Sequence, residues 1–226
     1  MLPHPRFIPV TLSALSSLLA LFAAATAAFA APDAEPTLGK RGKLLLEEKF
    51  EGSAVPAGWT KNTGKLEIHG GSLRSIEVAA DNHAAAFRKA LPLKDCLIQV
   101  DVKLDGPAGF NIGFDPSPGE LRKKGHLFSV VINPTGWQLV EHVDKGDATS
   151  KNTIHARGTA TFSRSEWFTL VLELKGNDVV ARIAGKEPLR ATAKDFHVKK
   201  PGLVFRVSGK TEHAGFIDNV KVWELL

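Results

Sequence analysis

Short runs of alternating apolar and polar residues constrain the fold of this chain more than any other feature of its sequence. The clearest run is 97–104 (LIQVDVKL), in which every second residue from Ile98 to Leu104 is apolar. Successive side chains of a β-strand point to opposite faces of a sheet, so this pattern predicts a strand with one face in the core. Similar runs predict about a dozen strands, at 44–50, 65–68, 72–78, 84–90, 97–104, 110–114, 127–132, 137–142, 168–174, 178–183, 202–207 and 216–223.

Turn-forming residues separate these runs. The segments 69–72 (HGGS), 133–136 (NPTG) and 175–178 (KGND) each predict a tight hairpin between two strands. No segment after residue 30 has ten residues of helical periodicity, so no crossover helices are expected. The sequence therefore predicts an all-β fold, an antiparallel two-sheet β-sandwich, rather than an α/β fold.

The first thirty residues have the pattern of a secretory signal peptide. Arg6 is followed by an uncharged segment, 7–30, which ends in Ala28-Phe29-Ala30, a small-x-small site for cleavage. The rival interpretation is an uncleaved membrane anchor, because the apolar run is long enough to span a bilayer. The Ala and Ser content and the AFA site favour cleavage. We therefore expect an exported protein, periplasmic or extracellular, with no membrane association after cleavage.

Residues 31–43 (APDAEPTLGKRGK) are polar and lack apolar periodicity, which predicts a flexible linker. The folded domain is expected at 44–226, a length that can bury a substantial core. Cys96 is the single cysteine, so no internal disulfide can form. Its apolar surroundings predict a buried small side chain rather than a reactive thiol.

The charge is modestly positive and dispersed. Without Arg6, the net charge becomes +4 from the +5 of the whole chain. The basic residues occur singly or in pairs such as Lys123-Lys124, whereas a nucleic-acid-binding protein usually has a clustered basic stripe. We expect no nucleic-acid partner and, at most, weak attraction to anionic polymers.

Several segments resemble a known group of folds. The segments 48–52 (EKFEG), 55–59 (VPAGW) and 66–73 (LEIHGGSL) are similar to the start of concanavalin A-like jelly rolls, and 166–173 and 215–223 resemble later strands. Secreted bacterial members include laminin-G-like domains and the 3-keto-disaccharide hydrolases. The resemblance implies a jelly roll and a carbohydrate or glycan ligand. It allows either an enzyme or a binding module, because function depends on the site rather than on the fold.

Catalytic motifs are absent from the sequence. Jelly-roll glucanases carry Glu-x-Asp-x-x-Glu or Glu-x-Asp-x-Glu on one strand, and this chain has neither. The nearest candidate, 141–144 (EHVD), places its two acids on opposite faces of a continued strand. The histidines are dispersed, and no metal, nucleophile or phosphate-binding motif occurs, so no cofactor and no metal are predicted.

The resemblance implies a concave sheet whose polar face lines a groove, and we expect the five runs from 84–90 to 137–142 to contribute to it. Asp101 or Glu141, together with His142, could act as acid and base there. Trp137 follows a hairpin and is expected to be an exposed ring, whereas the other tryptophans are expected to pack structurally. The alternative is that these are ordinary solvated sheet residues. The candidate ligand-binding residues are Arg88, Asp101, Asn111, His126, Trp137, Gln138 and His142.

Three functions therefore remain open. The first is a non-catalytic glycan-binding domain, favoured by the missing pair of carboxylates. The second is a glycoside hydrolase of the 3-keto-disaccharide hydrolase type. The third is a structural protein of the cell envelope.

Overall fold

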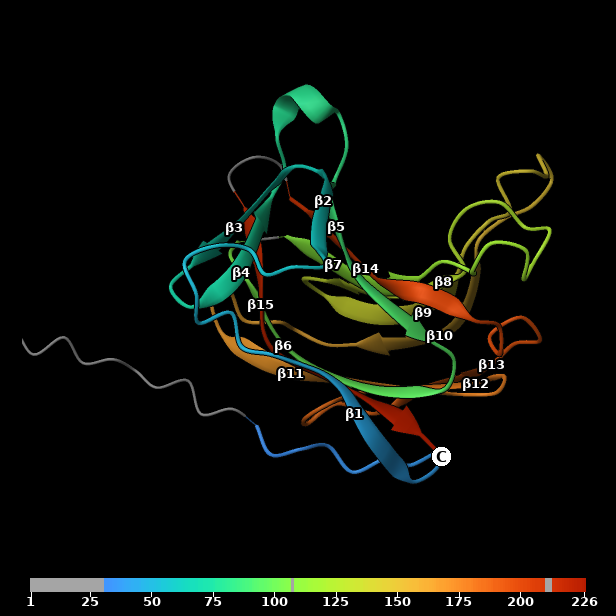
Figure 1. Ribbon diagram of the computed structural model, residues 1–226. Coiled ribbons are helices and arrows are strands. Elements are labelled where there is room, and N and C mark those ends of the chain that lie inside the picture. The colour runs from blue at the N-terminus through green and yellow to red at the C-terminus, as the bar shows by residue number, and fades with distance from the viewer. Residues whose placement is uncertain (1–30, 107, 210–212) are drawn as a thin grey trace, which may run out of the picture. The chain divides into compact units, whose positions relative to one another are not determined.

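The computed structural model describes residues 31–226, except for residue 107 and residues 210–212. Its strands form two antiparallel sheets that pack face to face (Figure 1). This confirms the predicted all-β sandwich. The predicted signal peptide, 1–30, lies outside the described residues. In the described part of the chain, no helix is long and apolar enough to cross a membrane.

Sheet A has eight strands. The first half of β15 (Ala214–Leu225) pairs with β4 (Ser72–Ile76), and its second half pairs with β1 (Arg41–Glu48). The other strands, in spatial order, are β13 (Leu189–Thr192), β12 (Asp178–Ile183), β11 (Trp167–Lys175), β6 (Cys96–Leu104), β15 (Ala214–Leu225), β4 (Ser72–Ile76) and β3 (Lys65–His69).

Sheet B has seven strands and carries the site described below. A single turn of 3-10 helix, Ala79–Asp81, lies in the connection between β4 and β5 (Ala85–Leu93). In spatial order the strands are β10 (Thr153–Thr159), β9 (Gly136–Glu141), β8 (Phe128–Asn133), β7 (Gly109–Phe114), β14 (Lys200–Ser208), β5 (Ala85–Leu93) and β2 (Trp59–Thr63).

The three predicted hairpins are confirmed. His69 pairs with Ser72, Asn133 with Gly136, and Lys175 with Asp178. The strands predicted from the sequence did not include β2, β10 and β13, and each of these lies at the edge of a sheet. An edge strand has one neighbour instead of two and often exposes polar side chains, so its apolar alternation is weak.

The core lies between the sheets and is rich in aromatic side chains. Phe87 and Phe205 stack with ring centroids 5.0 Å apart, and Phe114 and Phe128 lie 5.1 Å apart. Cys96 is also fully buried, and burial raises the pKa of its thiol to about 12. The thiol therefore remains protonated, as expected for a small core side chain.

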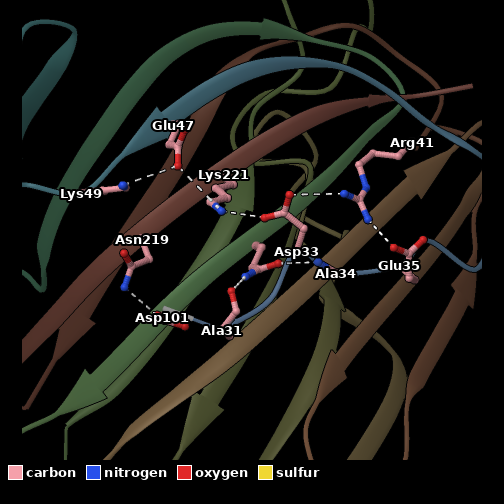
Figure 2. Close-up of polar contacts among 11 residues, drawn as sticks. Ala31, Asp33, Ala34, Glu35, Arg41, Glu47, Lys49, Asp101, Asn219 and Lys221 are labelled. Atoms are coloured by element: carbon pink, nitrogen blue, oxygen red, sulfur yellow. Dashed lines mark hydrogen bonds and ion pairs between the residues drawn. The ribbon is translucent and has the colours of Figure 1, made fainter. Parts of the chain in front are cut away.

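Residues 31–40, which we call the N-terminal strap, differ from the predicted flexible linker. They lie along the outer face of sheet A and precede β1, which begins at Arg41. The side chain of Gln99 accepts a hydrogen bond from the amide of Ala34 at 2.7 Å and donates to the carbonyl of Ala31 at 3.3 Å (Figure 2). Asp33 also pairs with Lys221 at 2.6 Å. Sequence reasoning missed these contacts because their partners come from strands far along the chain.

The strap explains why polar side chains are buried on an outer face. Glu173 is fully buried, and its carboxylate accepts hydrogen bonds from the amides of Thr37 at 2.6 Å and Leu38 at 2.8 Å. Arg182 pairs with the same carboxylate at 2.8 Å. A small second apolar cluster forms where Leu38 packs against Trp223 and its neighbours. The strap is thus part of the folded domain.

Candidate functional site on the outer face of sheet B

A row of polar side chains crosses the outer face of sheet B. The strand register places Arg206 of β14 opposite Asn111 of β7, then Val131 of β8, Gln138 of β9 and Arg157 of β10. The alternate residues on these strands, such as Phe205, point into the core. Because directly paired residues share a face, the row is presented on the side away from the core.

Asp115, just after β7, is the centre of a charged network at one end of this face. Its carboxylate accepts a hydrogen bond from Nη1 of Arg88 at 2.5 Å and one from Nδ1 of His126 at 2.5 Å. Burial acts to raise the pKa of Asp115, but the bonds from His126 and Arg88 outweigh it and hold the pKa below its usual value. Asp115 is therefore ionised at neutral pH and orients both partners.

His126 connects this network to the polar row. Its Nδ1 faces the Asp115 carboxylate, and its Nε2 contacts Nη2 of Arg206. A guanidinium can only donate, so Nε2 must accept and Nδ1 must carry the proton. The geometry therefore selects one neutral tautomer of His126, held between an acid and an arginine.

His142 lies next to this pair, with its ring centroid 5.7 Å from that of His126. Its Nε2 is 2.8 Å from the hydroxyl of Ser129. Burial, reinforced by the positive charge of Arg206, lowers the pKa of His142 to about 4. His142 is therefore neutral at physiological pH and acts as a hydrogen-bonding group.

Two hollows adjoin these residues. One of about 400 Å³ is lined by Arg88, Asp115 and His126 together with the loop after β7. A second, of about 230 Å³, is lined by Gln138 and Arg157 near the hairpin between β8 and β9. Ligand sites are usually concave, so both hollows suit parts of an extended ligand.

The structure brings together five of the seven candidate residues, since Arg88, Asn111, His126, Gln138 and His142 all lie on or beside this face. The sequence prediction did not include Asp115 and Arg206, which complete the network. Asp115 falls in the irregular segment after β7, where the strand pattern has ended. Arg206 lies in a run, 202–207, that the sequence identified as a strand but did not assign to this sheet.

Asp101 does not belong to this site. It lies on β6, in sheet A, where its carboxylate accepts hydrogen bonds from the hydroxyl of Thr169 at 2.5 Å and the amide of Asn219 at 2.9 Å. Figure 2 shows the bond between Asn219 and Asp101, to the left of Ala31. The prediction was wrong because β5 and β6, although joined by only two residues, belong to opposite sheets.

Trp137 is not an exposed ring. Only 2% of its surface is accessible, and it belongs to the core between the sheets. Its register partner is Ile132, which also points inward. The tryptophan with the largest exposure is instead Trp167 of sheet A, at 39%, and Nζ of Lys103 lies 4.9 Å from its ring. Trp59 and Trp223 are buried, as expected.

Glu141 and His142 do not form an acid–base pair. The Glu141 carboxylate is bound to His155 at 3.0 Å and to Lys123 at 3.6 Å, whereas His142 is bound to Ser129. Adjacent residues of an extended chain point in opposite directions, which separates the two side chains. In the described residues, no group of three or more His, Cys, Asp or Glu side chains is placed to hold a metal ion.

No protein-family model and no curated protein sequence matches this chain. Solved structures match it closely in fold. SCLam, a non-specific endo-β-1,3(4)-glucanase from family GH16, has a TM-score of 0.63 at 15% identity, over 87% of this chain and 95% of its own. A Bacillus subtilis protein of unknown function with a galectin-like fold has a TM-score of 0.62 at 14% identity, over 84% and 99%. The carbohydrate binding module CBM66 from Bacillus subtilis has a TM-score of 0.56 at 10% identity, over 74% and 96%. At these identities the likeness shows a concanavalin A-like jelly-roll sandwich and nothing further.

Proposed function

We propose that this protein is a non-catalytic glycan-binding domain that uses the outer face of sheet B. The observation that carries the proposal is the row of hydrogen-bonding side chains between the two hollows. Within the described residues, the amides of Asn111 and Gln138 form no side-chain hydrogen bond with protein, so both are available to sugar hydroxyls. The glucanase and the carbohydrate binding module that share this fold support a carbohydrate ligand.

The charges favour binding over hydrolysis. The usual glycosidase mechanism needs two carboxyl groups that converge on one bond. In the part of this face that the structure describes, Asp115 is already held by Arg88 and His126, and Glu141 is held by His155 and Lys123. The polar character of the face also speaks against a purely structural envelope protein.

The second candidate is a glycoside hydrolase of the 3-keto-disaccharide hydrolase type. The specific observation in its favour is the contact between Asp115 and His126, which fixes the tautomer of a histidine beside a hollow. An imidazole oriented by a carboxylate is a common general base. Turnover would therefore depend on His126.

The test is a binding and hydrolysis screen on the chain beginning at Ala31, with a panel of soluble polysaccharides and disaccharides. We expect binding without turnover, and loss of binding in the double variant Asn111→Ala/Gln138→Ala. Trp167→Ala serves as the comparison, because it removes the most exposed tryptophan ring from sheet A. Loss of binding in Trp167→Ala alone would move the site to sheet A. Turnover abolished by His126→Ala in a folded variant would favour the hydrolase.

We also infer that the protein is exported, to the periplasm or the extracellular space, after cleavage behind Ala30. The position of the strap supports this inference, because the carbonyl of Ala31 is already bonded to Gln99. Cleavage there would leave a chain whose first residue is part of the fold. The mass of the protein recovered from the periplasm or the medium tests this: a chain beginning at Ala31 is expected, and full-length protein in the membrane fraction would contradict it.

A further inference from the structure

The charge of Arg206 is poorly compensated. This side chain is half-buried in sheet B, and burial lowers its pKa. Its contact with His126 is to a neutral ring, and no carboxylate of the described residues lies within ion-pair distance of it. The nearby Asp115 is bound directly to Arg88. Asp115 attracts the Arg206 guanidinium but is not bound to it, so the partly desolvated guanidinium keeps donors that are suited to a planar anion.

Arg157 occupies the opposite end of the same row. It lies on the edge strand β10, is exposed, and forms no ion pair with the described residues. Four strand spacings separate it from Arg206, a distance of about 19 Å at about 4.8 Å per strand. The hollow beside Gln138 and Arg157 gives this end of the row a second concave site.

The side chains between the two arginines are neutral. Asn111 and Gln138 are amides that can both donate and accept hydrogen bonds, and Val131 between them is apolar. This combination suits the hydroxyl groups and the apolar ring face of a sugar. The row therefore offers a cation at each end and sugar-compatible groups in the middle.

We propose that the ligand of this face is an acidic oligosaccharide or polysaccharide, whose carboxylate or sulfate groups bind Arg206 and Arg157 while its hydroxyl groups bind Asn111 and Gln138. This inference rests on the proposed glycan-binding function and narrows it to one ligand class. The separation of the arginines requires a ligand of several sugar units. A charged group on a monosaccharide would reach one arginine and not the other.

The experiment compares polymers that differ only in charge. Binding of the chain beginning at Ala31 is measured by affinity electrophoresis and calorimetry with polygalacturonate and its methyl ester, and with dextran sulfate and dextran. The variants are Arg206→Gln, Arg157→Gln and, as a matched control, Arg190→Gln, which removes an exposed arginine from β13 of sheet A. Thermal unfolding establishes that each variant is folded, and the exposed Arg157 allows a test that does not disturb the His126 contact.

We expect the acidic member of at least one pair to bind and its neutral partner to bind at least about tenfold more weakly. Arg206→Gln and Arg157→Gln should each weaken binding about tenfold or more, as for the loss of a hydrogen bond to a charged group. Arg190→Gln should change it less than about twofold. Preference for polygalacturonate would identify a carboxylate as the recognised group, and preference for dextran sulfate would identify a sulfate.

Three results would overturn the inference. Equal binding of neutral and acidic partners, unaffected by Arg206→Gln, would refute the acidic ligand while leaving the proposed glycan-binding function intact. An equal loss in Arg190→Gln, or equal binding of a single-stranded oligonucleotide, would show general attraction between opposite charges. Absence of binding to every polymer, neutral or acidic, would refute both proposals.

Discussion

Replacing Glu173 by Gln tests whether the N-terminal strap stabilises the domain. The Glu173 carboxylate is fully buried and accepts the amides of Thr37 and Leu38 on one oxygen, and Arg182 and the Thr37 hydroxyl on the other. A Gln side chain has one oxygen and one NH2 group. In either orientation, the NH2 group would face at least one N–H donor: the amides of Thr37 and Leu38 on one side, or Arg182 on the other, where the Thr37 hydroxyl can turn to accept. At least one hydrogen bond would therefore be lost, and the remaining ones would no longer be charge-assisted.

The expected cost follows from these contacts. Each hydrogen bond to a charged group contributes about 1.5–3 kcal/mol, partly offset because the variant no longer buries a charge. We expect the free energy of unfolding to fall by about 2–4 kcal/mol. For a domain of this size, the midpoint of thermal unfolding should fall by roughly 5–15 °C. Urea unfolding followed by tryptophan fluorescence measures the change.

The control and the refuting result use the same assay. Glu47→Gln removes an exposed carboxylate that lies 3.7 Å from Lys221, and it should cost less than about 0.5 kcal/mol. In a chain shortened to begin at Gly39, Glu173 loses its strap partners and gains water, so Glu173→Gln should cost less than about 1 kcal/mol. An equal cost in the long and short chains would refute a stabilising role for the strap.

Three further predictions concern other buried charges. Lys200 donates hydrogen bonds to the carbonyls of Lys94, Phe196 and Val198 at 3.1, 2.8 and 2.7 Å. Lys200→Met should therefore lower the free energy of unfolding, measured in urea, by about 2–4 kcal/mol. An unchanged midpoint of urea unfolding would show that these bonds do not stabilise the fold. Because burial lowers the pKa of His142 to about 4, the stability that comes from its neutral form is fully present above pH 6.5 and is lost as the pH falls toward 4. His142→Gln should reduce this acid-induced loss of stability by about 1–2 kcal/mol, and an unaltered pH profile of stability would contradict this expectation. Burial, opposed by a hydrogen bond from the amide of Asn219 and reinforced by repulsion from Asp101 and Glu51, raises the pKa of Asp218 to about 6. Ionisation of Asp218 therefore opposes folding increasingly as the pH rises from its ordinary pKa near 4, and fully above pH 6. Asp218→Asn should stabilise the protein by about 1 kcal/mol at pH 7.5 and change it little at pH 4, and destabilisation at pH 7.5 would disprove the expectation.

The two candidates that the sequence misplaced failed for different physical reasons. The alternation around Asp101 identified β6 and the faces of its side chains, but a strand's own sequence does not state which sheet it joins. That depends on pairing with β11 and β15, which lie far along the chain. For Trp137, hairpin geometry mattered: Gly136 pairs with Asn133, and this register turns the next residue toward the core.

The linker prediction differed from the structure for a related reason. Polar composition indicates that a segment cannot form a core of its own. It does not show that the backbone of the segment can bind buried acceptors on other strands, such as Glu173 on β11 and Gln99 on β6. The alternating pattern of β6 includes Gln99 and Asp101 as outer residues, but both are buried. Gln99 is bound by the strap, and Asp101 by Thr169 and Asn219.

The sequence by itself determined the class of fold, three hairpins, the buried state of Cys96, and which strand faces are polar, because these properties depend on neighbours within a few residues. Only the tertiary structure decided which polar residues meet. Arg206 lies 80 positions after His126 in the chain, yet it forms one network with His126 and Asp115 because β14 inserts beside β7 in sheet B. The binding face is therefore a product of long-range strand pairing, which local patterns do not encode.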